Sequence, residues 1–400
     1  ENKSMTFKRW FFLLTSIVCY WMIVHDGIWA LLILSILIVV ADRTKSSLLA
    51  IASIALLVLG FVYFKVISSN TTLYGYSVFA FTGISFLVDQ YKKRESYSIL
   101  DTFVFLFFFP KMLAGPIVRV IDFIPQLSKS RCSSTLVYRG FKLVIYALFV
   151  KFIIADVLLS VEAEHRGINL LLQSFIWGIR FYFDFYAYSL LAVGVALVFG
   201  IVLPYNFDNP YSAQSFKDFW QRWNITLSTW LRTYIYIPLG GNRCSKNRAI
   251  LNILVTFVVS ALWHGLTIPF VFWGLAHAGL ICLERYVFIP FKGRWMYRVF
   301  VLLSCIFLWQ FFRFNNMTDI DIYFYNLTTE ERLKSSLLLS VICALVSLYV
   351  IESQWLKHMV FEMRSSHRAI ICEVTFFALL ITILVFFPIS YSFNFFYLNF

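Results

Sequence analysis

Hydrophobic runs bounded by short charged segments constrain the fold of this chain more than any other feature. Four such runs occupy residues 10–24, 28–41, 48–66 and 73–88. Further runs lie at 143–159, 168–185, 190–203, 250–263, 270–288, 299–312, 337–351 and 370–387. Since a helix needs about 20 apolar residues to cross a bilayer, we expect an all-α, polytopic integral membrane protein of about eleven spanning or re-entrant helices. Aromatic residues make up 20% of the chain, which favours a central cavity or funnel lined by some of these rings.

The composition excludes a soluble protein. Of the 400 residues, 60% are hydrophobic and only 14% are charged, whereas a water-facing surface needs roughly a quarter of its residues charged. The net charge of +13 would suggest nucleic-acid binding in a soluble protein. Here the basic residues lie in short clusters between apolar runs, as in cytoplasmic loops beside anionic headgroups. We therefore expect membrane lipid, and no nucleic acid, as a partner.

The chain has the organisation of one domain over residues 1–400, because it contains no internal repeat and no Gly/Ser-rich linker. The loops between the first four runs alternate in charge, which predicts a cytoplasmic N-terminus. Two stretches, near 105–139 and 204–248, do not follow the regular alternation of apolar runs and short charged segments. Both are punctuated by Pro and Gly, and irregular backbone at membrane depth needs protein or water to satisfy it. We expect interfacial or re-entrant segments there that together line the cavity.

The stretch 204–248 interleaves aromatic and basic side chains at helical spacing, giving an aromatic face and a basic face. A helix that simply rests on the headgroups is an equally good interpretation of this pattern. The stretch ends at Pro238–Arg243, where Pro and two glycines predict a turn. The residues behind the pattern are Phe216, Lys217, Asp218, Phe219, Trp220, Arg222, Trp223, Ile225, Leu227, Trp230, Leu231 and Arg232.

Two of the six histidines, His264 and His277, fall in or beside apolar runs, and the other four are expected to be solvated: His25, His165, His358 and His367. A histidine at membrane depth is a functional candidate by default, although a structural histidine bonded to a backbone carbonyl is an equal alternative.

Asp184 is a carboxylate within an aromatic run, and Arg180 precedes it by four residues. An i,i+4 ion pair could neutralise Asp184, or Asp184 could line a polar tunnel. Lys151 and Asp156 are five residues apart, a poor spacing for a pair on an α-helix, so we expect each to have other partners.

Common catalytic signatures are missing. The sequence contains no G-x-S-x-G, no H-E-x-x-H, no phosphate loop and no G-x-G-x-x-G after a strand. No acidic cluster and no C-x-x-C pair indicates a metal, so we expect none. A buried histidine downstream of an amphipathic Trp/Arg segment remains, and it suits a general base in a membrane-enclosed site.

The residues Asp218–Arg243, DFWQRWNITLSTWLRTYIYIPLGGNR, followed by Ala261–Gly265, ALWHG, closely resemble the signature of the membrane-bound O-acyltransferase (MBOAT) family. The likeness is to the bacterial branch that contains the alginate O-acetylation protein and the D-alanyl transfer protein of teichoic acids. Four more blocks match family landmarks in family order: Phe108–Arg119, Tyr182–Ser189, Pro204–Tyr211 and Phe396–Phe400.

The resemblance implies that His264 is the catalytic histidine and that Asn224 is the second catalytic polar residue. Here the chain departs from its branch, which usually has His at the position of Asn224, and it has Leu190 where the polysaccharide branch commonly has Asp. His264 would deprotonate an acceptor hydroxyl as it attacks a thioester, while Asn224 donates to the oxyanion or to His264. Arg222 and Arg232 could bind the phosphates of a CoA donor or contact headgroups. The candidates for substrate binding are Trp220, Arg222, Trp223, Ser228, Arg232, Trp263, Asp184 and Tyr188.

By this resemblance the chain is a multi-pass acyltransferase of a bacterial cytoplasmic (inner) membrane, acting in exopolysaccharide biosynthesis. It is expected to transfer acetyl from cytoplasmic acetyl-CoA to hydroxyls of an extracytoplasmic polysaccharide, directly or through an SGNH-type partner. No tightly bound cofactor is expected, since acetyl-CoA or another acyl thioester serves as the donor substrate. The alternatives are acyl transfer to a lipid or teichoic acid from another donor, or a transporter of acyl groups or solutes. A transporter commonly has internal repeats, and none is found.

Overall fold

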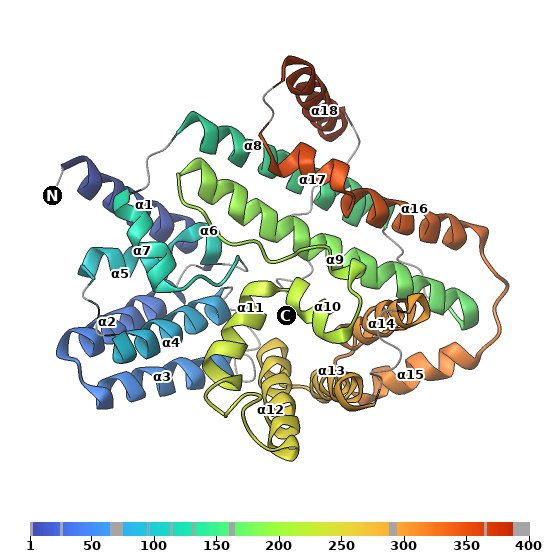
Figure 1. Cartoon of the computed structure of the whole chain (residues 1–400), viewed down its shortest axis with the longest axis horizontal. Coiled ribbons are helices and arrows are strands. Elements are labelled where there is room, and N and C mark those ends of the chain that lie inside the picture. Colours follow the sequence, from blue (N-terminus) through green and yellow to red (C-terminus); the bar gives the residue numbers. More distant parts are fainter. Residues whose placement is uncertain are drawn as a thin grey trace. The chain divides into compact units, whose positions relative to one another are not determined.

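A computed structural model describes residues 3–24, 27–64, 75–93, 95, 97–112, 115–129, 133–159, 165–287, 294–363 and 366–386. All regular structure in these residues is helical, which confirms the predicted all-α class (Figure 1). His25 and the terminal block Phe396–Phe400 lie outside the described residues. The chain divides into two compact units, one of Glu1–Gly140 with Ala192–Pro204, the other of Phe141–Leu191 with Tyr205–Phe400.

The first unit packs its long helices through small residues. Helix α4 packs against both α2 and α3 at Gly83, where a Cβ atom would lie 2.8 Å from Ile38 and 3.0 Å from Leu57. The expected irregular stretch near 105–139 consists of short helices and the beginning of α8. The helices are α1 (Lys3–Val24), α2 (Ile28–Thr44), α3 (Ser47–Val62), α4 (Tyr76–Lys93), α5 (Ile99–Phe107), α6 (Phe109–Met112), α7 (Val120–Lys129) and the start of α8 (Ser134–Phe149).

The second unit contains every candidate site residue. Its elements after α8 are the π-helix η3 (Val150–Leu158), α9 (Gly167–Val198), η4 (Pro210–Ser212), α10 (Phe216–Arg222), α11 (Ile225–Leu231), η5 (Arg232–Tyr236), α12 (Lys246–His264), α13 (Ile268–Tyr286), α14 (Trp295–Leu308), η7 (Trp309–Phe312), α15 (Met317–Thr328), α16 (Ser335–Ile351), α17 (Gln354–Phe361) and α18 (His367–Phe386).

Two runs that the sequence suggested as separate spans, 168–185 and 190–203, form one helix over most of their length. Helix α9 continues for 32 residues, from Gly167 to Val198. The residues between the two runs include no proline, and nothing else there stops the helix from propagating. The division into two spans was therefore wrong, because a change in hydrophobicity does not break a helix.

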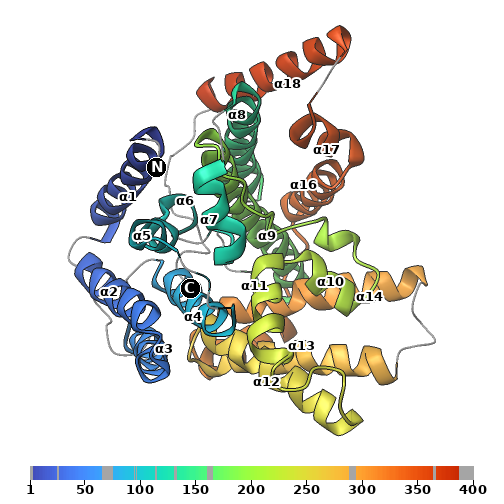
Figure 2. The same ribbon diagram turned by 60° about the vertical axis from the view of Figure 1, so that its left-hand side comes forward.

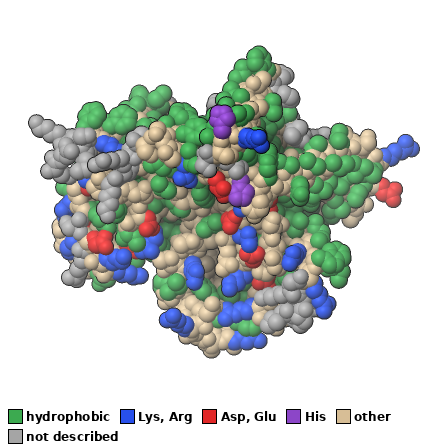
Figure 3. All heavy atoms as spheres, turned by 45° about the horizontal axis from the view of Figure 1, so that its top comes forward, with side chains coloured by type: hydrophobic (Ala, Val, Ile, Leu, Met, Phe, Trp, Pro, Cys, Tyr) green, Lys and Arg blue, Asp and Glu red, His purple; other side chains and the backbone are tan. Residues whose placement is uncertain are grey.

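Five described helices are long and apolar enough to cross a membrane, or six if the bent pair α16–α17 counts as one broken span. They are α9, α12, α13, α14 with η7, and α18. Apolar side chains also reach the surface, and on α18 Leu379, Val385 and Phe386 are 56%, 65% and 81% exposed. Figure 3 shows hydrophobic side chains spread widely over one face of the molecule. Such exposure fits a lipid-facing surface.

A close helix pair forms the framework of the candidate site. Helices α12 and α13 lie side by side (Figure 2), and Gly274 permits the contact. A Cβ atom on Gly274 would lie 2.7 Å from the carbonyl oxygen of Phe257 and 2.8 Å from the Cβ of Ala261. Small residues allow membrane helices to approach this closely. The pair therefore brings the end of α12 beside the middle of α13.

The expectation that Lys151 and Asp156 do not pair was wrong, and Asp184 pairs with Lys151 and not with Arg180. Lys151 Nζ lies 3.0 Å from Asp156 and 2.5 Å from Asp184, while Arg180 pairs with Asp156 at 3.6 Å. Lys151 and Asp156 lie on the π-helix η3, whose hydrogen bonds join residues five apart. That spacing brings side chains five residues apart onto one face, so the α-helical rule does not apply. We call these four residues the η3–α9 ion cluster.

One histidine expected to be solvated is buried. His165 is only 6% exposed, and its Nδ1 lies 3.2 Å from Lys334 Nζ and 3.8 Å from Glu331. Hydrogen bonds from the Arg166 backbone N–H and from the side chains of Lys334 and Asn169 lower the pKa of Glu331 to about 2. The sequence could not indicate this burial, because the two segments in contact are about 165 residues apart in the chain.

Candidate active site

His264 is the last residue of α12, and the chain turns sharply after it. Gly265 has an extended backbone (φ −174°), and the ring of Phe270 packs where a Cβ atom of residue 265 would be. The His264 ring is 7% exposed and meets Trp273 edge-on at 5.2 Å and Phe312 at 4.9 Å between centroids. The glycine therefore lets the α12–α13 turn close tightly around the imidazole.

His277 lies on the other side of the same tryptophan. Its ring centroid is 5.2 Å from that of Trp273 and 5.0 Å from that of Trp220. The indole Nε1–H of Trp220 donates to His277 Nδ1 at 3.3 Å. His277 has no exposed surface. Both imidazoles therefore contact the indole ring of Trp273. The distance between the His264 and His277 centroids cannot exceed the sum of their distances from the Trp273 centroid.

Helix α10 is held against α13 at its first turn as well as at Trp220. Glu284, 2% exposed, accepts hydrogen bonds from the backbone N–H groups of Phe216 and Lys217 and from the hydroxyl of Tyr297 at 2.9 Å. A carboxylate at a helix N-terminus satisfies amide groups that the helix leaves unpaired. Glu284 and His277 therefore fix the position of α10 through two polar contacts on one helix.

The chain breaks between α10 and α11 at Trp223 and Asn224. The irregular segment before α10 forms hydrogen bonds with this break. Asp208 N–H donates to the Arg222 carbonyl at 3.0 Å, and Ile225 N–H donates to the Asn206 carbonyl at 2.9 Å. Asn224 adopts the left-handed conformation (φ 42°, ψ 56°), which Asn tolerates better than most residues. The predicted continuous amphipathic pattern is therefore split into two short helices.

Asn224 is buried, and its side chain does not cap the helix that follows it. Asn224 is 5% exposed, and although it is the N-cap residue of α11, its side chain accepts no capping bond. Asn commonly serves as an N-cap through its side chain, and that role is not filled here. The amide is therefore not used for capping, which leaves it as a candidate for contact with substrate.

Trp223 connects this break with the histidines. Its ring stacks on Trp309 at 4.4 Å, and Trp309 lies 5.8 Å from Trp273 and 5.3 Å from Phe312. Helix α9 reaches the same cluster through Phe181 and Tyr182, whose centroids are 6.1 Å and 5.6 Å from Trp223. A continuous set of ring contacts thus joins the neighbourhood of Asn224 to His264.

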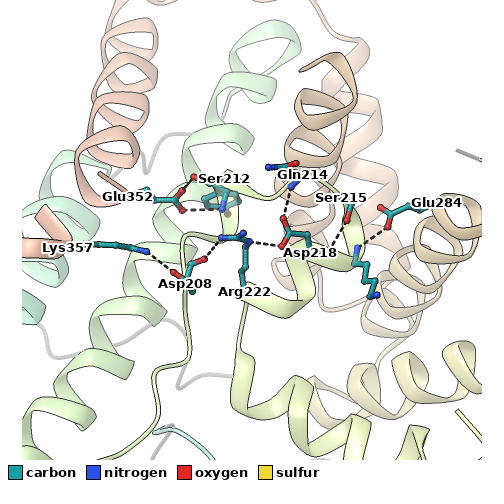
Figure 4. A network of polar contacts seen from close by, with 11 residues as sticks. Asp208, Ser212, Gln214, Ser215, Asp218, Arg222, Glu284, Glu352 and Lys357 are labelled. Atoms are coloured by element: carbon teal, nitrogen blue, oxygen red, sulfur yellow. Dashed lines mark hydrogen bonds and ion pairs between the residues drawn. The ribbon is translucent and has the colours of Figure 1, made fainter. Parts of the chain in front are cut away.

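Arg222 lies in a separate polar network at the end of α10 (Figure 4). Its Nε donates to Asp218 at 2.7 Å, and its Nη1 donates to the backbone carbonyl of Asp208 at 3.3 Å. The hydrogen bond to Asp218 raises the pKa of Arg222, which keeps the guanidinium charged. Arg222 thus has a carboxylate partner within its own helix.

The corner between α16 and α17 joins the same network. Glu352 accepts hydrogen bonds from the Ser212 hydroxyl at 2.6 Å and the Tyr211 backbone N–H at 3.1 Å, and Lys357 pairs with Asp208 at 2.7 Å (Figure 4). These contacts hold the segment before α10 in place.

The remaining candidates for substrate binding are distributed over the unit. Trp263 is adjacent to His264, and their ring centroids are 4.4 Å apart. Ser228 donates to the backbone carbonyl of Trp223 at 3.3 Å. Arg232 begins η5 and is exposed. Tyr188 is buried on α9, and Asp184 belongs to the η3–α9 ion cluster.

Two residues of the cluster, Trp273 and Trp309, were not among the candidates, and His277 was a candidate only as a histidine at membrane depth, without an assigned role. A sequence signal existed on α13, because Trp273, His277 and Glu284 share one helical face at intervals of four and seven residues. Trp309 had no such signal. It belongs to the short 3₁₀-helix η7, and only the tertiary fold brings it to Trp223.

The cluster combines two imidazoles, a buried amide and indole N–H groups inside an aromatic surrounding. Such groups can accept a proton and donate hydrogen bonds to oxygen, and burial strengthens both interactions. No three His, Cys, Asp or Glu side chains converge into a metal-binding group within the described part of the chain.

Comparison with known proteins places this geometry in context. The profile of the membrane-bound O-acyltransferase family matches residues 30–301. A probable alginate O-acetylase of Pseudomonas syringae pv. tomato is 32% identical over 61% of this chain and 49% of its own length. A peptidoglycan O-acetyltransferase of Helicobacter pylori is 37% identical over 46% of this chain and 37% of its own. A teichoic acid D-alanyltransferase of Bacillus subtilis is 28% identical over 55% and 62%. The chain spans about half the length of the alginate O-acetylases it matches.

Proposed function

Because this chain belongs to the membrane-bound O-acyltransferase family, we propose that it transfers acetyl from cytoplasmic acetyl-CoA to hydroxyls of an extracytoplasmic polysaccharide. The observation that carries the proposal is His264, a buried imidazole at the end of an apolar helix, in an aromatic cluster that also contains a second imidazole. The similar proteins named for alginate and peptidoglycan O-acetylation support the acceptor class.

In the proposed reaction His264 takes the proton of an acceptor hydroxyl as the hydroxyl oxygen attacks the thioester carbonyl. The tetrahedral intermediate collapses with cleavage of the carbon–sulfur bond, and the proton held by His264 passes to the departing thiolate. General base catalysis of this kind contributes a factor on the order of 10²–10⁴. Asn224, whose side chain makes no capping bond, donates to the oxyanion or orients His264. No tightly bound cofactor takes part.

The donor requires a site for its phosphates. Arg222 and Arg232 were both candidates, and their environments differ. Arg222 already has Asp218 as a partner at 2.7 Å, whereas Arg232 is exposed at the start of η5. A guanidinium without a nearby carboxylate binds phosphate more effectively, so we assign the donor phosphates to Arg232 before Arg222.

The wider setting is also a proposal. We propose that the chain lies in the bacterial cytoplasmic membrane and itself forms a bundle of about eleven spanning or re-entrant helices around a central cavity. An SGNH-type extracytoplasmic protein would complete the transfer if the acetyl group is handed on. A teichoic acid or lipid acceptor is the second candidate, supported by the similarity to the D-alanyltransferase.

Analysis of surface polymers tests the proposal. Ester-linked acetate is measured on each glycan of strains with the gene, without it, and complemented with the parent or the His264→Ala protein. Loss of acetate from one polymer, restored by the parent alone, supports the proposal. Loss of D-alanine instead would favour the teichoic acid alternative, and unchanged esters on every polymer would reject acyl transfer.

A further inference from the structure

The proposed reaction leaves His277 without a role, yet its protonation is constrained by its neighbour. Indole nitrogen can only donate a hydrogen bond, so the 3.3 Å contact from Trp220 requires His277 Nδ1 to accept. An imidazole that accepts at Nδ1 is neutral and carries its proton on Nε2. His277 therefore presents an Nε2–H donor.

That donor has no acceptor among the residues that the structure describes, and His277 is fully buried. The same holds for the indole Nε1–H of Trp273, which is also fully buried. Buried donors are nearly always paired, because an unpaired one loses its hydration without compensation. Two unmet donors on adjacent side chains, with ring centroids 5.2 Å apart, are therefore unusual.

Among the described residues, the surroundings supply rings but no hydrogen-bond acceptor to these two donors. The rings of Trp220, Phe257 and Trp309 pack around His277. Trp273, which carries the other donor, also touches His264. An oxygen bound between the two donors would thus lie next to the base of the proposed reaction. A carbonyl oxygen that becomes an oxyanion is the acceptor best matched to two neutral N–H donors in an apolar site.

We propose that Trp273 Nε1–H and His277 Nε2–H bind the carbonyl oxygen of the acyl thioester and stabilise the negative charge that develops on it. This inference rests on the proposed function. Trp220 is a positioning residue, because its hydrogen bond keeps the proton of His277 on Nε2. The hydrogen bond from Trp220 thus makes His277 Nε2–H a donor while the imidazole stays neutral.

Binding of two CoA compounds to the purified full chain tests the assignment. S-acetonyl-CoA carries a ketone carbonyl near the position of the thioester carbonyl and does not transfer its acyl group, whereas CoA lacks that carbonyl. The parent should bind S-acetonyl-CoA more tightly than CoA. Trp273→Phe and His277→Phe remove one donor each while keeping a ring, and each should reduce this preference roughly 5- to 10-fold. His277→Gln retains an N–H donor and should keep most of it.

Turnover gives a second measurement. Each Phe variant should lower kcat for acetyl transfer by about 10²–10³ with little change in KM for acetyl-CoA, because the contact strengthens in the transition state. Trp220→Phe should have the same effect to a smaller degree. Trp230→Phe, an equally conservative change at a buried indole on α11 whose ring contacts Tyr234, is the matched control and should leave the preference unchanged.

The outcomes separate this inference from the proposed function. Unchanged preference in both Phe variants, with CoA still bound, overturns the inference, as does equal affinity of the parent for the two compounds. Loss of preference in His277→Gln equal to that in His277→Phe also overturns it, because the packing and not the donor would then matter. A parent that neither binds CoA nor transfers acetate overturns the proposed function itself.

Discussion

Two buried polar regions of the second unit differ in how completely their groups are paired. In the η3–α9 ion cluster Lys151 contacts two carboxylates at 2.5 and 3.0 Å, and Arg180 approaches one of them at 3.6 Å. In the region around Trp273 and His277 two N–H donors have no acceptor among the described residues. Both regions bury polar atoms among aromatic rings, so burial alone does not distinguish them. The two regions differ in the number of polar groups that lack a hydrogen-bond partner, and a site that binds substrate must leave some of its groups unpaired.

The largest expected effect is on His264. His264→Ala should reduce acetyl transfer by a factor on the order of 10²–10⁴ or abolish it. The change should leave expression and melting temperature in detergent almost unaltered, since the side chain is at a helix end. Transfer to the acceptor and the melting curve are measured on the same preparation. Normal acetylation at normal protein levels would make His264 a structural residue and remove the contrast between the two regions.

Asn224 comes next, and its backbone conformation determines the design. Asn224→Gly keeps the left-handed conformation and removes the amide, so it should lower the rate by about 3–4 kcal/mol of transition-state stabilisation. Asn224→Ala should add strain of about 1–2 kcal/mol from the backbone alone. Asn224→His keeps a donor and tolerates the conformation, so it should retain measurable activity.

Rates of the three Asn224 variants across pH complete this test. The profile set by His264 should not shift in any of them, because an amide supplies no titrating group. A Gly variant as active as the parent would mean that Asn224 serves the backbone turn alone.

Substitutions in the η3–α9 ion cluster should lower the stability of the protein and leave its catalytic rate unchanged. Asp184→Ala removes the closer carboxylate partner of Lys151 and keeps the more exposed Asp156, and breaking a buried pair costs about 3–5 kcal/mol of folding free energy. The double variant Lys151→Met with Asp184→Leu should recover part of that loss, because both charges are gone. Activity per folded molecule, measured beside the melting temperature, decides whether Asp184 also binds substrate. A folded double variant with normal stability but no transfer would favour such binding.

The smallest expected effect concerns Glu331. Its pKa of about 2 in the folded protein is below the unfolded value near 4.3, so the folded state binds the proton less tightly. The stabilisation is therefore complete above that unfolded value and is lost as pH falls towards 2. Glu331→Gln should flatten the dependence of melting temperature on pH in this window and leave neutral-pH activity unchanged. Equal slopes for variant and parent would contradict the assigned contacts.

Much of the candidate site followed from local pattern. The position of His264 after an apolar run and the alternation of rings with basic residues in 216–232 are visible in the sequence. The turn at Pro238–Arg243 was confirmed, since Gly240 and Gly241 both have positive φ there. The break at Asn224 was not visible, because the flanking residues keep helical spacing. It depends on the hydrogen bonds from Ile225 N–H to the Asn206 carbonyl and from Asp208 N–H to the Arg222 carbonyl, and only the fold brings these segments alongside each other.

By itself the sequence determined the membrane class and the family signature, and it singled out His264 as the candidate base, because hydropathy and short motifs are properties of neighbouring residues. The tertiary structure alone decided which polar groups are paired. Lys151 meets Asp184 across 33 positions, and Trp220 reaches His277 across 57. Whether a buried donor finds an acceptor depends on atoms that are distant in the chain and adjacent in space. For that reason Trp273 became a candidate, and His277 gained a role, only when their surroundings were known.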